Sequence, residues 1–270
     1  MARTISWILF DCDGTLVNSE KPAMGVAIDV LADAVEAQRP MLTLDRQALV
    51  QEFTGGHFDQ MLSAMESRHG VSLDKAALSA DKTYRTIEAL KLISATPGMA
   101  NALARHDAAN GKRAIVTSSE FDRVNVSLIA AGLDGYFPAD LKFSAHDTLP
   151  TPTPKPDPSI YLHALKALKT TALDSVAVED SATGTKSARA AGIDVVGFVG
   201  ADHISDVRKA VVAQSLLNAG AAVVISHMDD LEAAVAFVAD PSVKASFTQP
   251  VFFNAPVAAS PAATPPAPQP

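Results

Sequence analysis

This 270-residue sequence has little cysteine and no long apolar run, and both absences narrow its class. Cys12 is the only cysteine, so the chain cannot form an intrachain disulfide or a thiolate metal centre. The first apolar run ends at Asp11 and is too short for a signal peptide, and no later run is long enough to span a membrane. We therefore expect a soluble cytoplasmic protein with no membrane partner.

Positive charge is also scarce, since 22 Lys and Arg residues stand against 30 Asp and Glu residues. The formal net charge is -8, and no block of basic residues is present that would follow a phosphate backbone. We therefore expect no nucleic acid partner.

Proline and alanine are instead concentrated at the C-terminus, in the segment QPVFFNAPVAASPAATPPAPQP (249–270). We interpret residues 248–270 as a disordered tail, because this composition does not support a compact fold. The apolar residues 251–253 offer an anchor, on this chain or on a second copy, but we expect a loosely attached end. The expected assembly is a monomer or a weak homodimer.

Short apolar runs rich in Val and Ile recur along the chain without polar alternation, which is typical of strands covered on both faces. The strands predicted from these runs are 6–10, 113–117, 175–179, 194–199 and 221–226. Helical patterns lie between them, at 99–111, 121–133, 158–168 and 181–192. This alternation predicts an α/β fold with a Rossmann-like parallel sheet.

Residues 22–94 interrupt this alternation with consecutive amphipathic helices and no convincing strand. We interpret residues 19–94 as an α-helical cap domain inserted after the first strand. Residues 1–18 and 95–247 then form the core domain, and the sequence TPG at 96–98 marks the return to the core.

Polar side chains follow several of the predicted strands. Functional groups collect at the carboxyl ends of the strands in an open parallel sheet. Asp11 and Asp13 follow the first strand, Thr117 ends the second, and Glu179 and Asp180 end a later one. The sequence therefore brings four acids and one hydroxyl to the same edge of the sheet.

The spacing of Asp11 and Asp13 lets both side chains point the same way, while the turn at Gly14 separates their roles. With Asp180 they supply oxygen ligands suited to a hard cation, for which we predict Mg2+. Lys155, in a loop stiffened by prolines, offsets the negative charge that would otherwise raise the carboxyl pKa values. These groups fit phosphoryl transfer through an aspartyl-phosphate.

Four motifs in this order resemble those of the haloacid dehalogenase superfamily of phosphohydrolases. They are DCDGT, the Thr of AIVTSS, the Lys of PKPDP, and the acidic pair of VEDSATGTKSARAAG. The resemblance covers roughly residues 5 to 200. The helical insertion is similar to the cap of the β-phosphoglucomutase and phosphoglycolate phosphatase-like branch.

The resemblance implies a role for each residue that matches a motif. Asp11 is the nucleophile, Asp13 is the general acid and then the base, and Lys155 pairs with Asp11. Thr117 contacts a phosphoryl oxygen, with Ser118 as an alternative phosphate ligand. The implied Mg2+ ligands are the Asp11 carboxylate, the Asp13 backbone carbonyl, Asp180 and Glu179.

Charged and polar residues of the predicted cap are candidates for substrate selection. His57 follows a Gly-rich turn and is a candidate substrate contact, although such a residue is more often on the surface or in a cap. Lys75, Lys82 and Arg85 are weaker candidates, because charges on amphipathic helices usually face water.

We therefore predict a Mg2+-dependent phosphatase acting on a small phosphorylated metabolite, in particular a sugar phosphate. A phosphosugar mutase of the β-phosphoglucomutase type uses the same core residues and is the main alternative. A haloacid dehalogenase fits less well, because Asp13 suits acid and base work on a phosphoester. A non-catalytic binding protein of the same fold has little need for a cluster of acids that is costly to bury.

Overall fold

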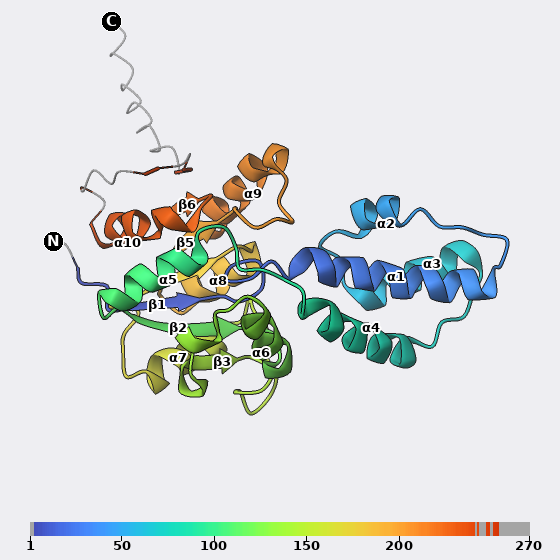
Figure 1. The fold of residues 1–270 in the computed structure, drawn as a ribbon, viewed down its shortest axis with the longest axis horizontal. Coiled ribbons are helices and arrows are strands. Elements are labelled where there is room, and N and C mark those ends of the chain that lie inside the picture. The colour runs from blue at the N-terminus through green and yellow to red at the C-terminus, as the bar shows by residue number, and fades with distance from the viewer. Residues whose placement is uncertain (1–2, 241, 243–246, 249–250, 254–270) are drawn as a thin grey trace, which may run out of the picture.

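The computed structural model describes residues 3–240, 242, 247–248 and 251–253 (Figure 1). The strands are β1 (Trp7–Phe10), β2 (Lys112–Thr117), β3 (Lys142–Ser144), β4 (Ser175–Glu179), β5 (Asp194–Phe198) and β6 (Val223–Ile225). The helices outside the insertion are α5 (Met99–Ala108), α6 (Phe121–Ala130), α7 (Ser159–Ala167), α8 (Ala182–Ala190), α9 (Asp206–Ala219) and α10 (Leu231–Ala239). Among these residues, no helix is both long and apolar enough to cross a bilayer.

The six strands form one parallel sheet in the order β3-β2-β1-β4-β5-β6. β1 and β4 lie side by side at its centre, with Phe10 opposite Val178, so their carboxyl ends meet. The predicted α/β fold is confirmed. Our sequence analysis missed β3, because this three-residue strand has polar residues at both ends and little apolar signal. It also did not identify α9 and α10.

Helices cover both faces of the sheet, so alternate residues of each strand face different cores. Ile8 and Phe10 of β1 contact the cluster that includes α5, α6 and α10. Leu9 contacts the cluster of α7, α8 and α9. Burial on both faces explains why the strands have continuous apolar runs. It also fixes the direction in which the residues after each strand leave the sheet.

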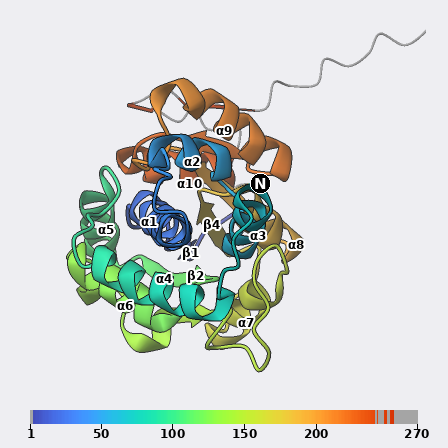
Figure 2. The same cartoon turned by 90° about the vertical axis from the view of Figure 1, so that its right-hand side faces the viewer.

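The insertion consists of α1 (Glu20–Gln38), α2 (Arg46–Phe53), α3 (Phe58–His69) and α4 (Lys75–Leu90), which we call the cap. It has its own apolar cluster, formed around Ile28, Leu31 and Met65. The chain leaves and re-enters the core at one point, where Val17 pairs with Ala95. Viewed from the cap side, α1 lies in front of the central strands of the sheet (Figure 2).

The expectation of a wholly disordered tail is wrong for residues 251–253. Phe252 and Val224 of the edge strand β6 exchange two backbone hydrogen bonds, each 3.0 Å long. The ring of Phe253 packs against Phe237 of α10 and Phe247, with ring centroids 5.2 and 5.9 Å apart. Residues 251–253 pair with the outer edge of β6 through the backbone of Phe252, and composition alone does not reveal such pairing. The remainder of the predicted tail, 254–270, lies outside the described residues.

We expect deletion of residues 249–270 to lower the free energy of unfolding by roughly 2 kcal/mol, because the two ring contacts of Phe253 and the two edge hydrogen bonds of Phe252 are lost. Deletion of residues 254–270 alone serves as the matched control and should leave the free energy of unfolding unchanged. Urea unfolding of both truncated proteins measures the difference. Equal stability of the two would show that the docked segment contributes nothing.

Candidate active site

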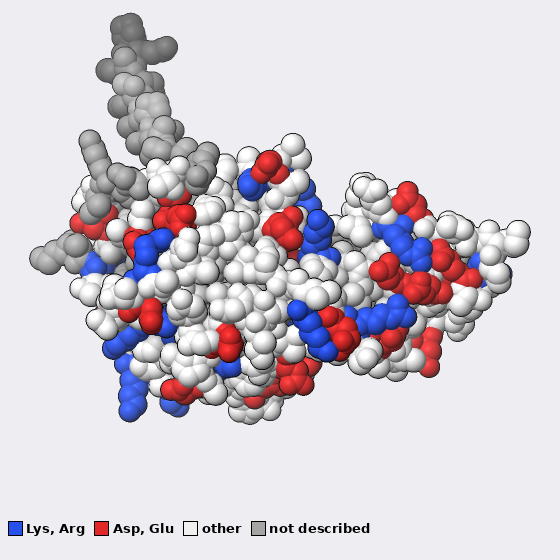
Figure 3. Space-filling model, viewed as in Figure 1, with Lys and Arg blue, Asp and Glu red and all other residues white. Residues whose placement is uncertain are grey.

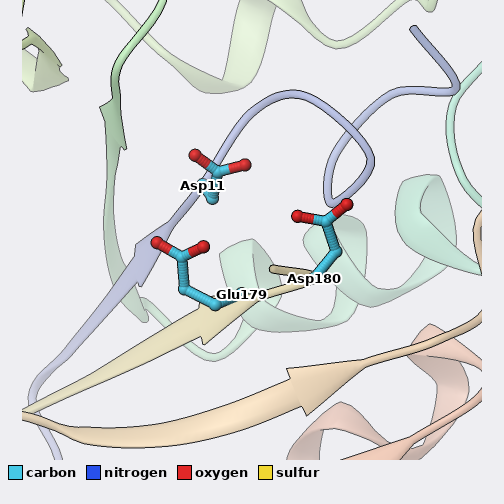
Figure 4. Close-up of side chains that lie close together, drawn as sticks. All are labelled: Asp11, Glu179 and Asp180. Atoms are coloured by element: carbon cyan, nitrogen blue, oxygen red, sulfur yellow. The ribbon is translucent and has the colours of Figure 1, made fainter. Parts of the chain in front are cut away.

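Three carboxylates converge at the carboxyl ends of the central strands (Figure 4). Asp11 follows β1, Glu179 is the last residue of β4, and Asp180 comes next. One oxygen of each lies within 4.8 Å of the others. Glu179 is fully buried and Asp11 is only 8% exposed. Since like charges at this separation repel, the group requires a compensating cation.

Lys155 supplies part of that compensation. Its Nζ atom lies 2.7 Å from Asp11 Oδ1, 2.6 Å from Glu179 Oε1 and 2.7 Å from the Val116 carbonyl, to all of which it donates. The lysine side chain is 6% exposed. Its backbone N–H donates to the Ser118 hydroxyl at 3.1 Å, which attaches the proline-rich loop to the end of β2. One buried ammonium thus serves two carboxylates.

One ammonium leaves this group of acids short of positive charge. Burial raises the pKa of Asp11 to about 8, with Lys155 opposing the shift and Glu179 adding to it. Burial, followed by the charges of Asp11 and Glu179, raises the pKa of Asp180 well above its ordinary value. The charged forms of these acids are therefore costly without a further cation.

The surroundings of the acids fit a hard cation. Glu179 Oε1 accepts from the Tyr161 hydroxyl at 2.6 Å, whereas its buried Oε2 has no hydrogen-bond partner among the described residues. Asp180 Oδ2 lies so close to Gly14, whose φ is +72°, that a Cβ atom there would be 2.0 Å away. Glycine is thus required both for the turn and for the room that Asp180 occupies. Three carboxylates, one of them with an oxygen that has no hydrogen-bond partner, suit a divalent cation that binds oxygen ligands.

Asp13 lies apart from this group and has different partners. Its carboxylate accepts hydrogen bonds from the hydroxyls of Ser19 and Ser119, both at 2.5 Å, and from Arg123 Nη2 at 3.0 Å. Burial opposes its charged form, but the guanidinium and the hydroxyls prevail and hold the pKa of Asp13 below its ordinary value. Although two residues apart, Asp11 and Asp13 thus have opposite pKa shifts, and this difference suits them to different roles.

A cleft of about 440 Å3 gives access to these residues. Its lining brings together six residues that the sequence predicted: Asp11, Asp13, Thr117, Ser118, Lys155 and Asp180. The buried Thr117 hydroxyl accepts from the backbone N–H of Ser119 at 3.1 Å. A larger cavity, of about 610 Å3 between α8 and α9, contains none of these groups.

The motifs, their places on the sheet and the carboxylate geometry can now be set beside known proteins. A family model described as haloacid dehalogenase-like hydrolase matches residues 5–192. The chain belongs to the haloacid dehalogenase-like hydrolase family. The resemblance that the four motifs predicted is therefore confirmed.

Relatives and solved structures agree with this family. A 6-phosphogluconate phosphatase of Escherichia coli (strain K12) is 30% identical over 199 residues, which are 74% of this chain and 85% of the relative. A haloacid dehalogenase-like protein of unknown function from Agrobacterium tumefaciens is 31% identical with a TM-score of 0.69, over 87% of this chain and 100% of that one. A family hydrolase from Deinococcus radiodurans, solved with bound phosphate and sodium, is 29% identical with a TM-score of 0.66, over 88% and 97% of the two chains.

Among the cap candidates, three lie away from the catalytic cleft. His57 precedes α3 and is exposed. Lys75 pairs with Glu66 at 3.3 Å, and Arg85 pairs with Asp33 and Asp81, both at 3.0 Å. Such pairing explains why acidic and basic side chains lie intermixed over the cap in Figure 3. Exposed pairs of this kind contribute little stability and leave these cations engaged.

Our sequence analysis missed several residues that line the cleft, namely Glu20, Ser119, Arg123 and His203. His203 lies in the loop after β5, with its Nε2 3.9 Å from Asp180 Oδ2. The rule that functional groups follow strand ends applies to β5 as well and points to this loop. Arg123 lies in the first turn of α6, and no local sequence pattern distinguishes it from a solvated arginine.

The raised pKa of Asp11 predicts a pH-dependent stability in the absence of metal. Folded Asp11 holds its proton up to a pKa of about 8, whereas the unfolded chain loses it near the ordinary value of 3.8, so the free energy of unfolding falls as the pH rises between these values. The slope is at most roughly 1.4 kcal/mol per pH unit. Urea unfolding in EDTA measures this loss, which should be smaller in Asp11→Asn, where Asp180 still has a raised pKa, and should be reduced by Mg2+. A wild-type profile identical to that of Asp11→Asn would contradict the prediction.

Proposed function

We propose that this hydrolase is a Mg2+-dependent phosphatase that cleaves a small sugar phosphate through an aspartyl-phosphate on Asp11. The observation that carries the proposal is the buried pair of Asp11 and Lys155 within a group of three carboxylates. The relative named as a 6-phosphogluconate phosphatase and the related hydrolase with bound phosphate support the substrate class.

Asp11 performs the nucleophilic step. Lys155 holds Oδ1, whereas Oδ2 has no hydrogen bond from a described residue and is the oxygen available to phosphorus. As the new bond from Asp11 to phosphorus forms, the bond from phosphorus to the sugar oxygen breaks. Thr117 and Ser118, which line the cleft, then donate hydrogen bonds to the transferred group, and the positive charge of Lys155 offsets its negative charge.

Asp13 moves the protons. It donates one to the leaving sugar oxygen and later takes one from the water that attacks phosphorus and frees Asp11. The lowered pKa of Asp13 suits the second step, in which it acts as a base. The negative charge of the substrate phosphoryl group favours the protonated form of Asp13 that the first step needs. The hydroxyls of Ser19 and Ser119 orient its carboxylate between the two steps.

The acidic group would hold the metal ion through Asp11, Asp180 and the backbone carbonyl of Asp13, with Glu179 as a direct or water-mediated ligand. A Mg2+ ion bound there would supply positive charge that favours the ionised form of Asp11 and would polarise the phosphoryl oxygens. The unpartnered Oε2 of Glu179 and the raised pKa of Asp180 support this assignment.

The test is phosphate release from a panel of sugar phosphates and phosphorylated sugar acids, with Mg2+ and with EDTA. We expect release from at least one member, lost in EDTA and restored by Mg2+. Conversion of β-glucose 1-phosphate to glucose 6-phosphate without net release would instead favour the mutase. Release that is unchanged by EDTA would refute the metal dependence.

A further inference from the structure

A second cavity adjoins the catalytic cleft where the cap meets the core. Its volume is about 210 Å3, and it is lined by residues of α4, by the loop between β2 and α6, by Arg123 in the first turn of α6 and by His146 after β3. Ser118, Ser119 and Arg123 line both spaces. A compact ligand held in the catalytic cleft can therefore reach into this cavity.

Lys82, on α4, lines this cavity without an ion-pair partner. Among the described residues, no carboxylate lies within ion-pair distance of its Nζ atom, and its recorded contact is the ring of Phe58, with Nζ 5.1 Å from the centroid. Arg46, Lys75 and Arg85 of the cap all form ion pairs with acids. Partial burial lowers the pKa of Lys82 and the charge of Arg123 lowers it further, with the charge of Asp59 opposing the shift, so Lys82 and Arg123 are close enough to repel each other.

Arg123 faces the cavity from α6 with donors to spare. Its Nε and Nη2 atoms donate to Asp13 Oδ1 at 3.3 and 3.0 Å, and Nη2 also lies 3.8 Å from Glu20 Oε1. Its Nη1 has no hydrogen-bond partner among the described residues. Glu120, an acid that lines the same cavity, lies 3.5 Å from His146. The cavity therefore combines an ammonium without an ion-pair partner and a guanidinium whose Nη1 is available.

We propose that Lys82 and Arg123 together bind a second anionic group of the substrate, a carboxylate or a phosphate, while the reacting phosphate lies at Asp11. The inference rests on the proposed function and narrows the substrate class to compact molecules with two anionic ends. An anion removes the repulsion between the two cations and gains charge-assisted hydrogen bonds from both. Because one cation belongs to the cap and the other to the core, the same anion also joins the two parts.

Substrate pairs that differ only in the second anion provide the test. 6-Phosphogluconate and sorbitol 6-phosphate share one carbon chain and differ in a carboxylate against a hydroxymethyl group. Xylulose 1,5-bisphosphate and xylulose 5-phosphate differ in a second phosphate. We expect Lys82→Met to raise KM about tenfold for the dianionic member that the wild type prefers, with kcat nearly unchanged. KM for the partner without the second anion should stay the same.

Two further variants separate this role from general damage to the cap. Lys82→Arg keeps the charge and should keep the preference. Lys91→Met removes an exposed lysine that pairs with Glu88 just after α4, and it should leave both substrates unaffected. An equal effect of Lys82→Met on both members of a pair, or no effect on either, would overturn the inference.

Binding to the inactive Asp11→Asn protein separates this inference from the proposed function. Calorimetry should show that 6-phosphogluconate binds more tightly than sorbitol 6-phosphate, and that Lys82→Met removes most of the difference. If the wild type hydrolyses no compound of the panel while this pattern holds, the proposed function fails and the second-anion site stands. Equal binding of both compounds, with and without Lys82, refutes the site.

Discussion

Replacing Asp11 by Asn is expected to lower kcat for phosphate release by on the order of 10,000-fold, because the amide lacks the charged oxygen that attacks phosphorus. The amide has nearly the same shape, and its oxygen can still accept the hydrogen bond from Lys155, which is 2.7 Å long in the wild type. The folded state should be at least as stable near neutral pH, since a buried carboxyl group with a raised pKa is removed. Steady-state kinetics and urea unfolding measure both effects.

Asp134→Asn is the matched control, because Asp134 is an exposed acid outside the cleft. It should leave kcat and stability unchanged. If Asp11→Asn retains the activity of this control, Asp11 is not the nucleophile.

Replacing Lys155 by Met is expected to lower kcat by on the order of 1,000-fold and the free energy of unfolding by roughly 3 to 5 kcal/mol. Methionine fills a similar volume but leaves Asp11 and Glu179 without the cation that they share at 2.7 and 2.6 Å. Mg2+ should restore part of the stability, because it supplies positive charge to the same carboxylates. The free energy of unfolding falls because the buried acids lose their counter-charge, and kcat falls further because the transferred group loses a neighbouring positive charge.

Lys166→Met, at an exposed lysine of the following helix, controls for the loss of a charge from this part of the chain. This variant should change neither kcat nor the free energy of unfolding. A Lys155→Met protein that matched this control in stability would show that Lys155 does not neutralise the buried acids.

Most of the core could be predicted because strands buried on both faces leave an unmistakable apolar signal. Each such strand also places the residues that follow it at the same edge of the sheet. That geometry is why Asp11 and Lys155 are in contact although 144 residues separate them. The predicted roles of these residues follow from the family motifs and await the experiments above.

Side-chain partners were harder to predict, because they depend on packing between elements. Arg123 contacts Asp13 only because α6 leaves β2 in one direction, and Lys82 faces Arg123 only because α4 packs against α6. The docking of residues 251–253 was an alternative that the sequence analysis did not favour, because the bonds between Phe252 and Val224 are made by the backbone, which composition does not describe.

The most direct test of the account is to locate the phosphoryl group on the enzyme. In Asp13→Asn, p-nitrophenyl phosphate should transfer its phosphoryl group readily, because this leaving group needs no acid, while hydrolysis is slow for want of a base. After acid quenching, mass spectrometry should find one added phosphoryl group on Asp11, and none when Asp11 is also replaced by Asn. A phosphoryl group on any other residue, or steady turnover that proceeds without a covalent intermediate, would contradict the central claim.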